Sequence, residues 1–250
     1  PTTSSAASDV YKRQVACLEL HIEQGKVLEQ KNIDIGIVRS IPSISRFSVE
    51  VNGQAGHSGT ILMDQRADAL VTSSEIITFV NKLASRLAKE SNQHFVSTIG
   101  KINVHPNAAA IIPGKVEMTI DLRASSKSSR DQYIKELEKQ IETMNQSGPC
   151  KIKMKNIAFA PYVEMDKELV KLFKISSDEY GFSNIIMDSG AGHDTAHLSR
   201  VAPASMIFVP CMDGLSHCPE EYAEISDISK GTSVLFLSLI HISEPTRRNS

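Results

Sequence analysis

Three histidines of this sequence stand where reacting or ligating side chains are usually found. His21 comes directly after a strand-like run and is followed by Gln24, His217 follows the compact apolar run 204–210, and His193 follows three small residues. In α/β proteins the ends of strands are where ligands bind, and imidazole serves as an acid, a base or a metal ligand. Taken one at a time, each of these histidines is more typical of an ordinary surface or core position.

A second pattern offers a different metal site. His193 and His197 are four residues apart in HDTAH, so on a helix both rings would share one face, as in HExxH zinc sites. Asp194 replaces the usual Glu with a shorter carboxylate. Gly190 and Gly192 discourage a helix just upstream. We therefore regard the HDTAH pattern as the weaker of the two interpretations.

Composition limits the classes of partner. With 250 residues, 41% hydrophobic and 22% charged, the chain can bury one large core or two small ones. A net charge of −2 gives no basic field for nucleic acid or a membrane surface, and no apolar run approaches the roughly 20 residues that span a bilayer. A small-molecule partner is expected. The four cysteines lack CxxC spacing and no charged-then-apolar leader opens the sequence, which favours a reducing cytoplasm.

The two ends differ from the rest of the sequence. Residues 1–14 are small and polar without periodicity, and residues 238–250 end in a string unrelated to the preceding helical pattern. We interpret both as non-native flanks similar to translated vector sequence and leave them out of the functional argument. Ordinary disordered termini are the alternative.

The region 43–157 predicts a complete small domain. Apolar residues alternate in strand-like runs and recur at three- and four-residue steps in helix-like runs. The order is β-α-β-β-α-β, typical of a ferredoxin-like α+β domain. The expected elements are strand 47–51, helix 64–89, strands 94–104 and 115–123, helix 128–145 and strand 151–158.

The segments on either side of this region read as α/β structure. Residues 15–42 hold a short strand around Leu18 and Leu20, and residues 158–237 hold a helix from Lys167 to Tyr180 and a buried strand from Ala204 to Pro210. The fold class we predict is an α/β catalytic-domain remnant, 15–42 plus 158–237, with an inserted α+β domain at 43–157.

Five motifs resemble those of one family. They occur in the order LELHIEQGKVLE, GQAGHSGTILMDQRADAL, HPNAAAIIPGKVEMTIDLR, MDSGAGHD and MIFVPCMDGLSHCPEE. Together they resemble the N-carbamoyl-L-amino-acid hydrolase, allantoate amidohydrolase and β-ureidopropionase family, within the aminoacylase-like metallopeptidase clan. The resemblance covers about 15–237 and implies a metal-dependent hydrolase that cleaves linear amide or ureido C–N bonds.

The resemblance implies a role for each matching residue. His21 and His217 correspond to metal ligands of a site with two divalent ions, for which zinc, manganese or cobalt suits imidazole. Gln24 would lie at the edge of the substrate. The inserted domain would be a lid through which two chains form a homodimer, lending residues to the neighbouring active site.

Within the inserted domain, the resemblance assigns His57 and Asn107 to the developing oxyanion and Arg123 to the substrate carboxylate. We also assign His193 to substrate binding. On the residues alone, a turn histidine, a turn-capping asparagine and a strand-end surface arginine would be the simpler interpretations of the first three.

The resemblance also implies residues that this sequence lacks. The family's bridging Asp, first His and paired Glu lie upstream of LHIEQG, yet only twenty residues precede His21 and none is histidine. We therefore expect an N-terminally truncated fragment that binds metal weakly and is inactive. The alternative is a non-catalytic dimerisation or binding module. The sequence does not decide among N-carbamoyl amino acids, allantoate and β-ureidopropionate as substrates.

Overall fold

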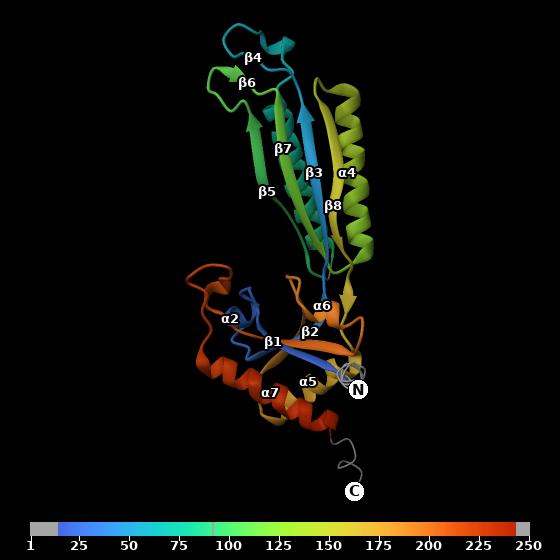
Figure 1. Ribbon diagram of the computed structural model, residues 1–250, viewed down its shortest axis with the longest axis vertical. Helices are drawn as coiled ribbons and strands as arrows, with labels where there is room; N and C mark the ends of the chain where they lie inside the picture. Colours follow the sequence, from blue (N-terminus) through green and yellow to red (C-terminus); the bar gives the residue numbers. More distant parts are fainter. Residues whose placement is uncertain (1–14, 92, 244–250) are drawn as a thin grey trace, which may run out of the picture. The chain divides into compact units, whose positions relative to one another are not determined.

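The computed structural model describes residues 15–91 and 93–243, which form two compact units (Figure 1). One unit is Pro42–Tyr162, here called the insert unit. The other, here called the flanking unit, consists of the described residues before and after it. Residues 1–14 and 244–250, which belong to the two predicted non-native flanks, lie outside the described residues.

The insert unit has two helices on one face of a four-stranded antiparallel sheet. Its strands lie in the order β5-β7-β3-β8, and β4 pairs with β6 in a separate short ribbon. The main elements follow one another as β-α-β-β-α-β, in the order that the sequence predicts. Their bounds are β3 Ser43–Asn52, β4 Gly56–His57, the 3-10 turn η1 Met63–Gln65, α3 Ala69–Glu90, β5 Phe95–His105, β6 Ile111–Ile112, β7 Lys115–Ala124, α4 Lys127–Ser147 and β8 Lys151–Ala160.

The alternation of buried and less buried residues along the strands explains how the core of the insert unit forms. In β7 every second residue is buried, as expected for a sheet with one face covered. Both helices contribute to the same core, and Tyr133 of α4 is fully buried with its hydroxyl 2.8 Å from Ser97 Oγ. Most of the apolar residues that recur in the helix-like runs therefore hold the helices to the sheet, whereas Leu70 and Val71 of α3 are exposed.

Helix α3 begins five residues later than the sequence suggests. We predicted a start at Asp64, but Met63–Gln65 form a 3-10 turn and α3 starts at Ala69. The Asp68 carboxylate accepts hydrogen bonds from the backbone N–H groups of Leu70 and Val71, at 2.9 and 3.1 Å. Asp68 is thus the N-cap that fixes the start of the helix.

The flanking unit contains a mixed sheet in the order β1-β11-β2-β10, with β9 also paired to β2. The β1–β11 and β10–β2 pairs are parallel, and β11–β2 is antiparallel. The elements are β1 Cys17–Ile22, α2 Val27–Lys31, β2 Ile35–Ile41, β9 Val163–Glu164, α5 Lys167–Glu179, β10 Asn184–Asp188, α6 Thr195–Leu198, β11 Ala204–Val209, the 3-10 turn η2 Met212–Gly214 and α7 Ile225–Ser243.

Strand β2 was not among the predicted elements, although it lies inside the sheet. Gly36 allows close approach at this point, because a β-carbon there would lie 2.7 Å from Met187 Sδ and 3.2 Å from Phe208 Cβ. A glycine within a short apolar run weakens the strand pattern in the sequence. The same glycine permits the packing that places β2 between β11 and β10.

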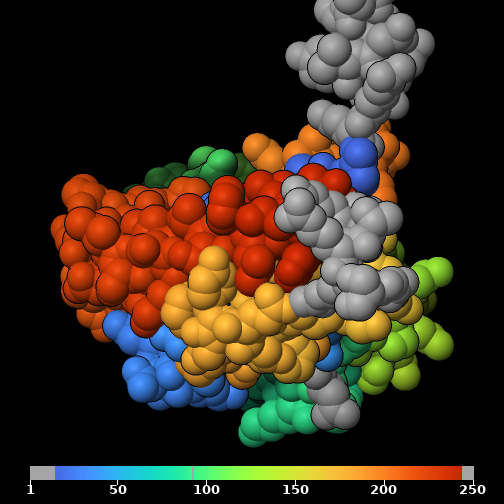
Figure 2. Space-filling view, turned by 90° about the horizontal axis from the view of Figure 1, so that it is seen from below, coloured from blue at the N-terminus to red at the C-terminus, as the bar shows by residue number. Residues whose placement is uncertain are grey.

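Helix α7 packs beside α5, and Figure 2 shows the two side by side on one face. Ser238 of α7 is buried and its hydroxyl donates to Ser176 Oγ at 2.9 Å. The helix continues to Ser243, so residues 238–243, which we predicted to be part of a non-native flank, are helical. Among the described residues no helix is long and apolar enough to cross a membrane.

Candidate metal centre

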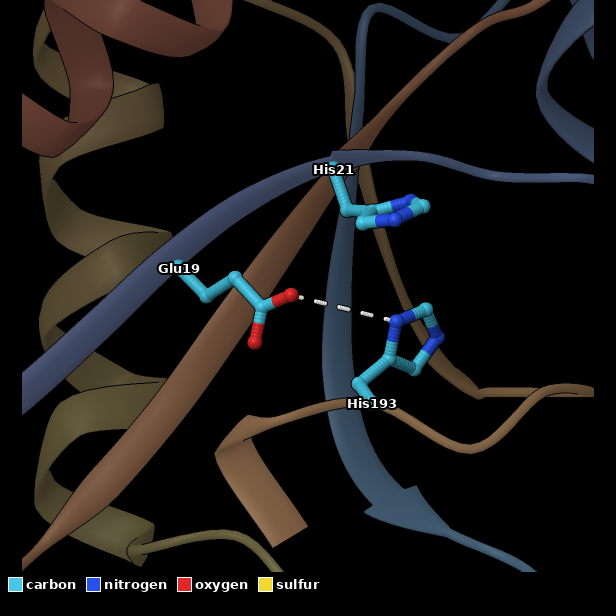
Figure 3. A group of neighbouring side chains, drawn as sticks. All are labelled: Glu19, His21 and His193. Carbon is cyan, nitrogen blue, oxygen red and sulfur yellow. Dashed lines mark ion pairs between the residues drawn. The ribbon is translucent and has the colours of Figure 1, made fainter. Parts of the chain in front are cut away.

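Glu19, His21 and His193 bring their side chains together in the flanking unit (Figure 3). Glu19 and His21 are two residues apart in β1, so they project from the same face of the strand. His193 comes from the loop between β10 and α6. One ligand atom from each residue lies within 4.8 Å of the other two, and His193 Nδ1 is 3.9 Å from Glu19 Oε1.

Each side chain of this cluster has one polar atom already engaged. Glu19 Oε2 accepts hydrogen bonds from the backbone N–H and the hydroxyl of Thr195. His21 Nδ1 lies 2.8 Å from the carbonyl oxygen of Ile22 and so donates to it. His193 Nε2 lies 2.9 Å from Ser189 Oγ. The remaining atoms, Glu19 Oε1, His21 Nε2 and His193 Nδ1, are available to a ligand.

His193 is in the form that a metal requires. The pKa of His193 is lowered from 6.5 to about 4, mainly by burial and also by the nearby His21, although Glu19 and Asp194 act in the opposite direction. The His21 and His193 rings meet edge to face with centroids 4.7 Å apart, and Phe208 closes another side at 5.4 Å from His193. At neutral pH the imidazole is therefore uncharged and keeps a lone pair for coordination.

The donor set fits a divalent transition metal. Two imidazoles and one carboxylate are a combination that binds zinc in hydrolytic sites, with a further position open. Metal-binding histidines usually donate their other N–H to a carbonyl or carboxylate, as His21 does to Ile22. Within residues 15–91 and 93–243, this is the one group of three or more such ligands.

His217, the second predicted metal ligand, is not part of this cluster. It is exposed in the loop after η2, and its backbone N–H donates to Glu221 Oε2 at 3.1 Å. Gln24 lies next to this loop, because its side-chain amide donates to Ser216 Oγ at 2.7 Å. The structure therefore joins the HIEQG and DGLSH segments through Gln24 and Ser216 rather than through the two histidines.

Glu23, which neighbours Gln24, has a structural role. It is buried, and its two carboxylate oxygens accept from the backbone N–H groups of Val27 and Leu28 at 2.9 and 2.8 Å. These are among the N–H groups that the first turn of α2 leaves without helical partners. Glu23 thereby fixes the segment that follows His21.

Three of the predicted site residues adopt a left-handed backbone conformation. Gln24, Asn107 and His217 have φ of 57°, 57° and 59°. Asn32 and Asp213 are the other non-glycine residues with positive φ in the described part of the chain. This conformation costs energy for residues with a β-carbon and tends to occur at functional sites.

In the insert unit, His57 and Asn107 lie on adjacent segments. His57 pairs with Ile111 in the β4–β6 ribbon, and its Nδ1 accepts from Gly59 N at 3.0 Å. Asn107 begins the segment that leads into β6. Both residues are exposed.

Arg123 lies near the opposite end of the sheet. It is paired with Val96 in β5, whereas Lys115, eight residues earlier in β7, is paired with His105 beside the ribbon. Eight residues of strand span about 26 Å. Arg123 is also hydrogen bonded through Nε to Asp121 at 3.0 Å.

The HDTAH pattern does not form a helical pair. His193 precedes α6, a helix of only 4 residues, whereas His197 lies within it and is exposed. His193 is buried against β1 instead. Glu19, by contrast, was not among the predicted site residues. Its two-residue spacing from His21 within a strand was the available signal.

Comparison with known proteins places the chain in a family. The model of peptidase family M20/M25/M40 matches residues 5–241. An N-carbamoyl-L-amino-acid amidohydrolase from a Pseudomonas species is 39% identical over 89% of this chain and 53% of its own length. An allantoate amidohydrolase from Bacillus subtilis is 37% identical over 88% of this chain and 52% of its own. The chain thus spans about half the length of these curated relatives.

A solved structure agrees with this assignment. An amidase of the hydantoinase/carbamoylase family from Burkholderia multivorans aligns with a TM-score of 0.85 and 31% identity, over 91% of this chain and 55% of that one. The aligned region therefore includes most of both the flanking unit and the insert unit. The chain belongs to peptidase family M20/M25/M40.

Proposed function

We propose that this chain is part of a metal-dependent amidohydrolase that hydrolyses linear amide or ureido C–N bonds. The observation that carries the proposal is the convergence of Glu19, His21 and His193 in a member of this peptidase family. N-carbamoyl-L-amino acids and allantoate are the substrates named by relatives, and β-ureidopropionate is a further candidate of the same chemical type.

Two divalent ions, of zinc, manganese or cobalt, are part of the proposal. His21 would hold one ion together with Glu19 and His193, and His217 would belong to the second. This assigns His193 to the metal rather than to the substrate, where the sequence placed it. When bound, the metal would supply Lewis acidity toward the carbonyl group that is attacked.

The protein residues would bind and orient the substrate. The guanidinium group of Arg123 can form two parallel hydrogen bonds to a substrate carboxylate. His57 and Asn107 can donate to the oxygen that gains negative charge during attack. Gln24, held by Ser216, would contact the substrate from the HIEQG segment.

A homodimer through the insert unit, acting as a lid, would bring the substrate-binding residues to one site. Within one insert unit, Arg123 lies about 26 Å along β7 from the end where His57 and Asn107 lie. A small ureido compound is much shorter than this span. A site that uses all three residues therefore requires them from two copies of the chain.

Metal titration tests the centre directly. Zn²⁺ or Co²⁺ is added to the purified chain, and binding is followed by calorimetry and by Co²⁺ visible absorption. We expect His21→Asn and Glu19→Gln each to weaken metal binding by about 100-fold or more. Loss of a ligand should cost at least as much affinity as loss of a hydrogen bond that supports a ligand. His197→Asn is the matched control, because this histidine is exposed on α6. Equal losses in all three variants would contradict the site.

Turnover tests the reaction. The chain and a longer protein that supplies the upstream ligands are assayed for ammonia release from an N-carbamoyl-L-amino acid and from allantoate. We propose that the chain alone is inactive, since of the metal ligands that the family resemblance implies only His21 and His217 are present. Full turnover by the chain alone would overturn this part. No turnover by the longer protein would favour a non-catalytic dimerisation or binding module.

The cysteines bear on the compartment. All four, Cys17, Cys150, Cys211 and Cys218, are free thiols. Free thiols persist where the surroundings are reducing. We therefore propose the cytoplasm as the site of action, and fractionation of the producing cells would test it.

A further inference from the structure

Ser189, immediately after β10, occupies a fixed position between the sheet and the candidate centre. It is fully buried, and its backbone N–H donates to Ser40 O at 2.9 Å. The preceding residue, Asp188, is held by two hydrogen bonds from Arg39, at 2.7 and 3.1 Å, and by one from the Ser40 hydroxyl at 2.7 Å. The hydroxyl of Ser189 is therefore placed by strand β2, independently of any ligand.

Three groups contact Ser189 Oγ, and one assignment of donors and acceptors satisfies all three contacts. The Ala191 carbonyl oxygen, 2.9 Å away, can only accept, so the single hydroxyl hydrogen points to it. The Ala191 backbone N–H, at 3.0 Å, can only donate. The third contact is His193 Nε2 at 2.9 Å. In the assignment that satisfies all three contacts, Ala191 O takes the hydroxyl hydrogen, so Ser189 accepts from His193 and His193 Nε2 carries the proton.

A neutral imidazole carries one N–H, so the proton on Nε2 leaves His193 Nδ1 without one. Nδ1 is the atom that faces Glu19 Oε1 at 3.9 Å. Without Ser189, the nearby carboxylate would attract a proton to Nδ1, and that proton would occupy the lone pair a metal needs. Ser189 and Glu19 therefore favour opposite tautomers of the same ring.

We propose that Ser189 is a positioning residue that holds His193 in the Nε2–H tautomer, so that Nδ1 is presented to a metal ion beside Glu19 and His21. The proposal rests on the metal centre described under the proposed function. It goes beyond that function by assigning a role to a hydroxyl that touches neither metal nor substrate. Partners of this kind typically change metal affinity by about 10- to 100-fold.

Ring ¹⁵N chemical shifts of the metal-free chain test the tautomer without any metal. Chains labelled at histidine are compared at neutral pH, and the signals of His193 are identified by their loss in His193→Asn. We expect an unprotonated Nδ1 in the wild type and a shift of the proton toward Nδ1 in Ser189→Ala. An Nδ1–H in the wild type would overturn the proposal, and so would an unchanged tautomer in Ser189→Ala.

Zn²⁺ titration of the same variants tests the consequence. Ser189→Ala is expected to lose about 10- to 100-fold in affinity, and Ser189→Thr, which keeps the hydroxyl, to recover most of it. Ser199→Ala is the matched control, because Ser199 Oγ also donates to a backbone carbonyl, that of Ala196 at 3.0 Å, but the hydroxyl has no histidine partner there. An equal loss in Ser199→Ala would indicate a general effect on the loop and overturn the specific role. If the wild type binds no Zn²⁺, the metal centre fails, yet the ¹⁵N shifts still decide the role of Ser189.

Discussion

The insert unit is built from consecutive segments of the chain, whereas the flanking unit joins segments from both sides of it. In the insert unit, strands of about ten residues pair along their full length, and its candidate residues are held locally, His57 by Gly59 and Arg123 by Asp121. In the flanking unit, Thr195 and Glu19 bond across 176 positions. The candidate residues of the insert unit are thus held by contacts close in sequence, whereas those of the flanking unit are held by contacts between distant segments.

The largest effect is expected from removing a core side chain in each unit. Phe173 and Leu122 are both fully buried, in the flanking and insert units respectively. We expect Phe173→Ala to cost about 3–5 kcal/mol and Leu122→Ala about 2–5 kcal/mol of unfolding free energy. Hydrogen exchange read by mass spectrometry locates the loss, which should stay within the mutated unit. If Leu122→Ala also weakened Zn²⁺ binding, the centre would not depend on the flanking unit alone.

Asp34→Asn tests the hydrogen bonds that connect distant segments of the flanking unit. The Asp34 carboxylate accepts from Ser183 N and Oγ and from Lys230 Nζ, at 2.9, 2.7 and 2.6 Å. Burial opposes ionisation, but the hydrogen bonds from Lys230 and Ser183 outweigh it and lower the pKa of Asp34 below 3.8. At pH 7 we expect a loss of about 1–2 kcal/mol on substitution.

The pH dependence of this loss has a defined sign. Because the folded-state pKa is lowered, the unfolded chain binds more protons near pH 4. The contribution of Asp34 is therefore complete above the unfolded value and disappears as pH falls through the folded one. Urea unfolding at pH 7 and pH 3 measures the free energy of unfolding of the wild type and of Asp34→Asn. The difference between the two proteins should become smaller at the lower pH. A difference that became larger at pH 3 would contradict the assignment of Lys230 and Ser183 as partners of Asp34.

The helix caps offer a matched pair across the two units. Asp68 caps α3 of the insert unit, and Asp166 caps α5 of the flanking unit by accepting from Glu168 N and Leu169 N, both at 3.0 Å. Each Asp→Ala substitution should cost about 1 kcal/mol. Hydrogen exchange should show loss of protection in the insert unit for Asp68→Ala and in the flanking unit for Asp166→Ala. Loss of protection in both units from either variant would mean that the two unfold together.

The smallest effect is a gain. Gly100 lies in β5, and a β-carbon there would have nothing within 4 Å. Gly100→Ala is expected to stabilise the insert unit by about 0.5 kcal/mol, mainly by restricting the unfolded chain. Gly114→Ala is the contrasting variant, since its β-carbon would lie 2.8 Å from Ala55 N, and it should destabilise. Thermal unfolding of the two variants should move the midpoint in opposite directions.

Periodicity predicted the insert unit well because its signals are local. Alternation in β3 and β7 and the three- and four-residue steps of α3 and α4 are properties of single segments. The start of α3 was wrong because Asp68, four residues after the predicted start, accepts the first free N–H groups. A cap of this kind is decided by side-chain geometry that an apolar pattern does not contain.

The flanking unit and its centre were harder to predict for the opposite reason. Glu19 reads as an ordinary polar residue of an alternating strand, and only the return of the chain at His193 and Thr195 gives it a role. Likewise, β2 carries Gly36 and a short apolar run, and the sheet around it defines it as a strand. The sequence motifs pointed to His21 and His193, and the three-dimensional pairing added Glu19 beside them.

The distance in sequence between Glu19 and Thr195 also has a meaning in time. At roughly 5–20 residues per second, a ribosome needs about 9–35 s to add the 176 positions that separate them. During that interval Pro42–Tyr162 is synthesised as one continuous stretch. Strand β11, with which β1 pairs, is synthesised only afterwards. Glu19 and His21 are thus among the first described residues to be made, and Thr195 and His193 follow only after the whole insert unit.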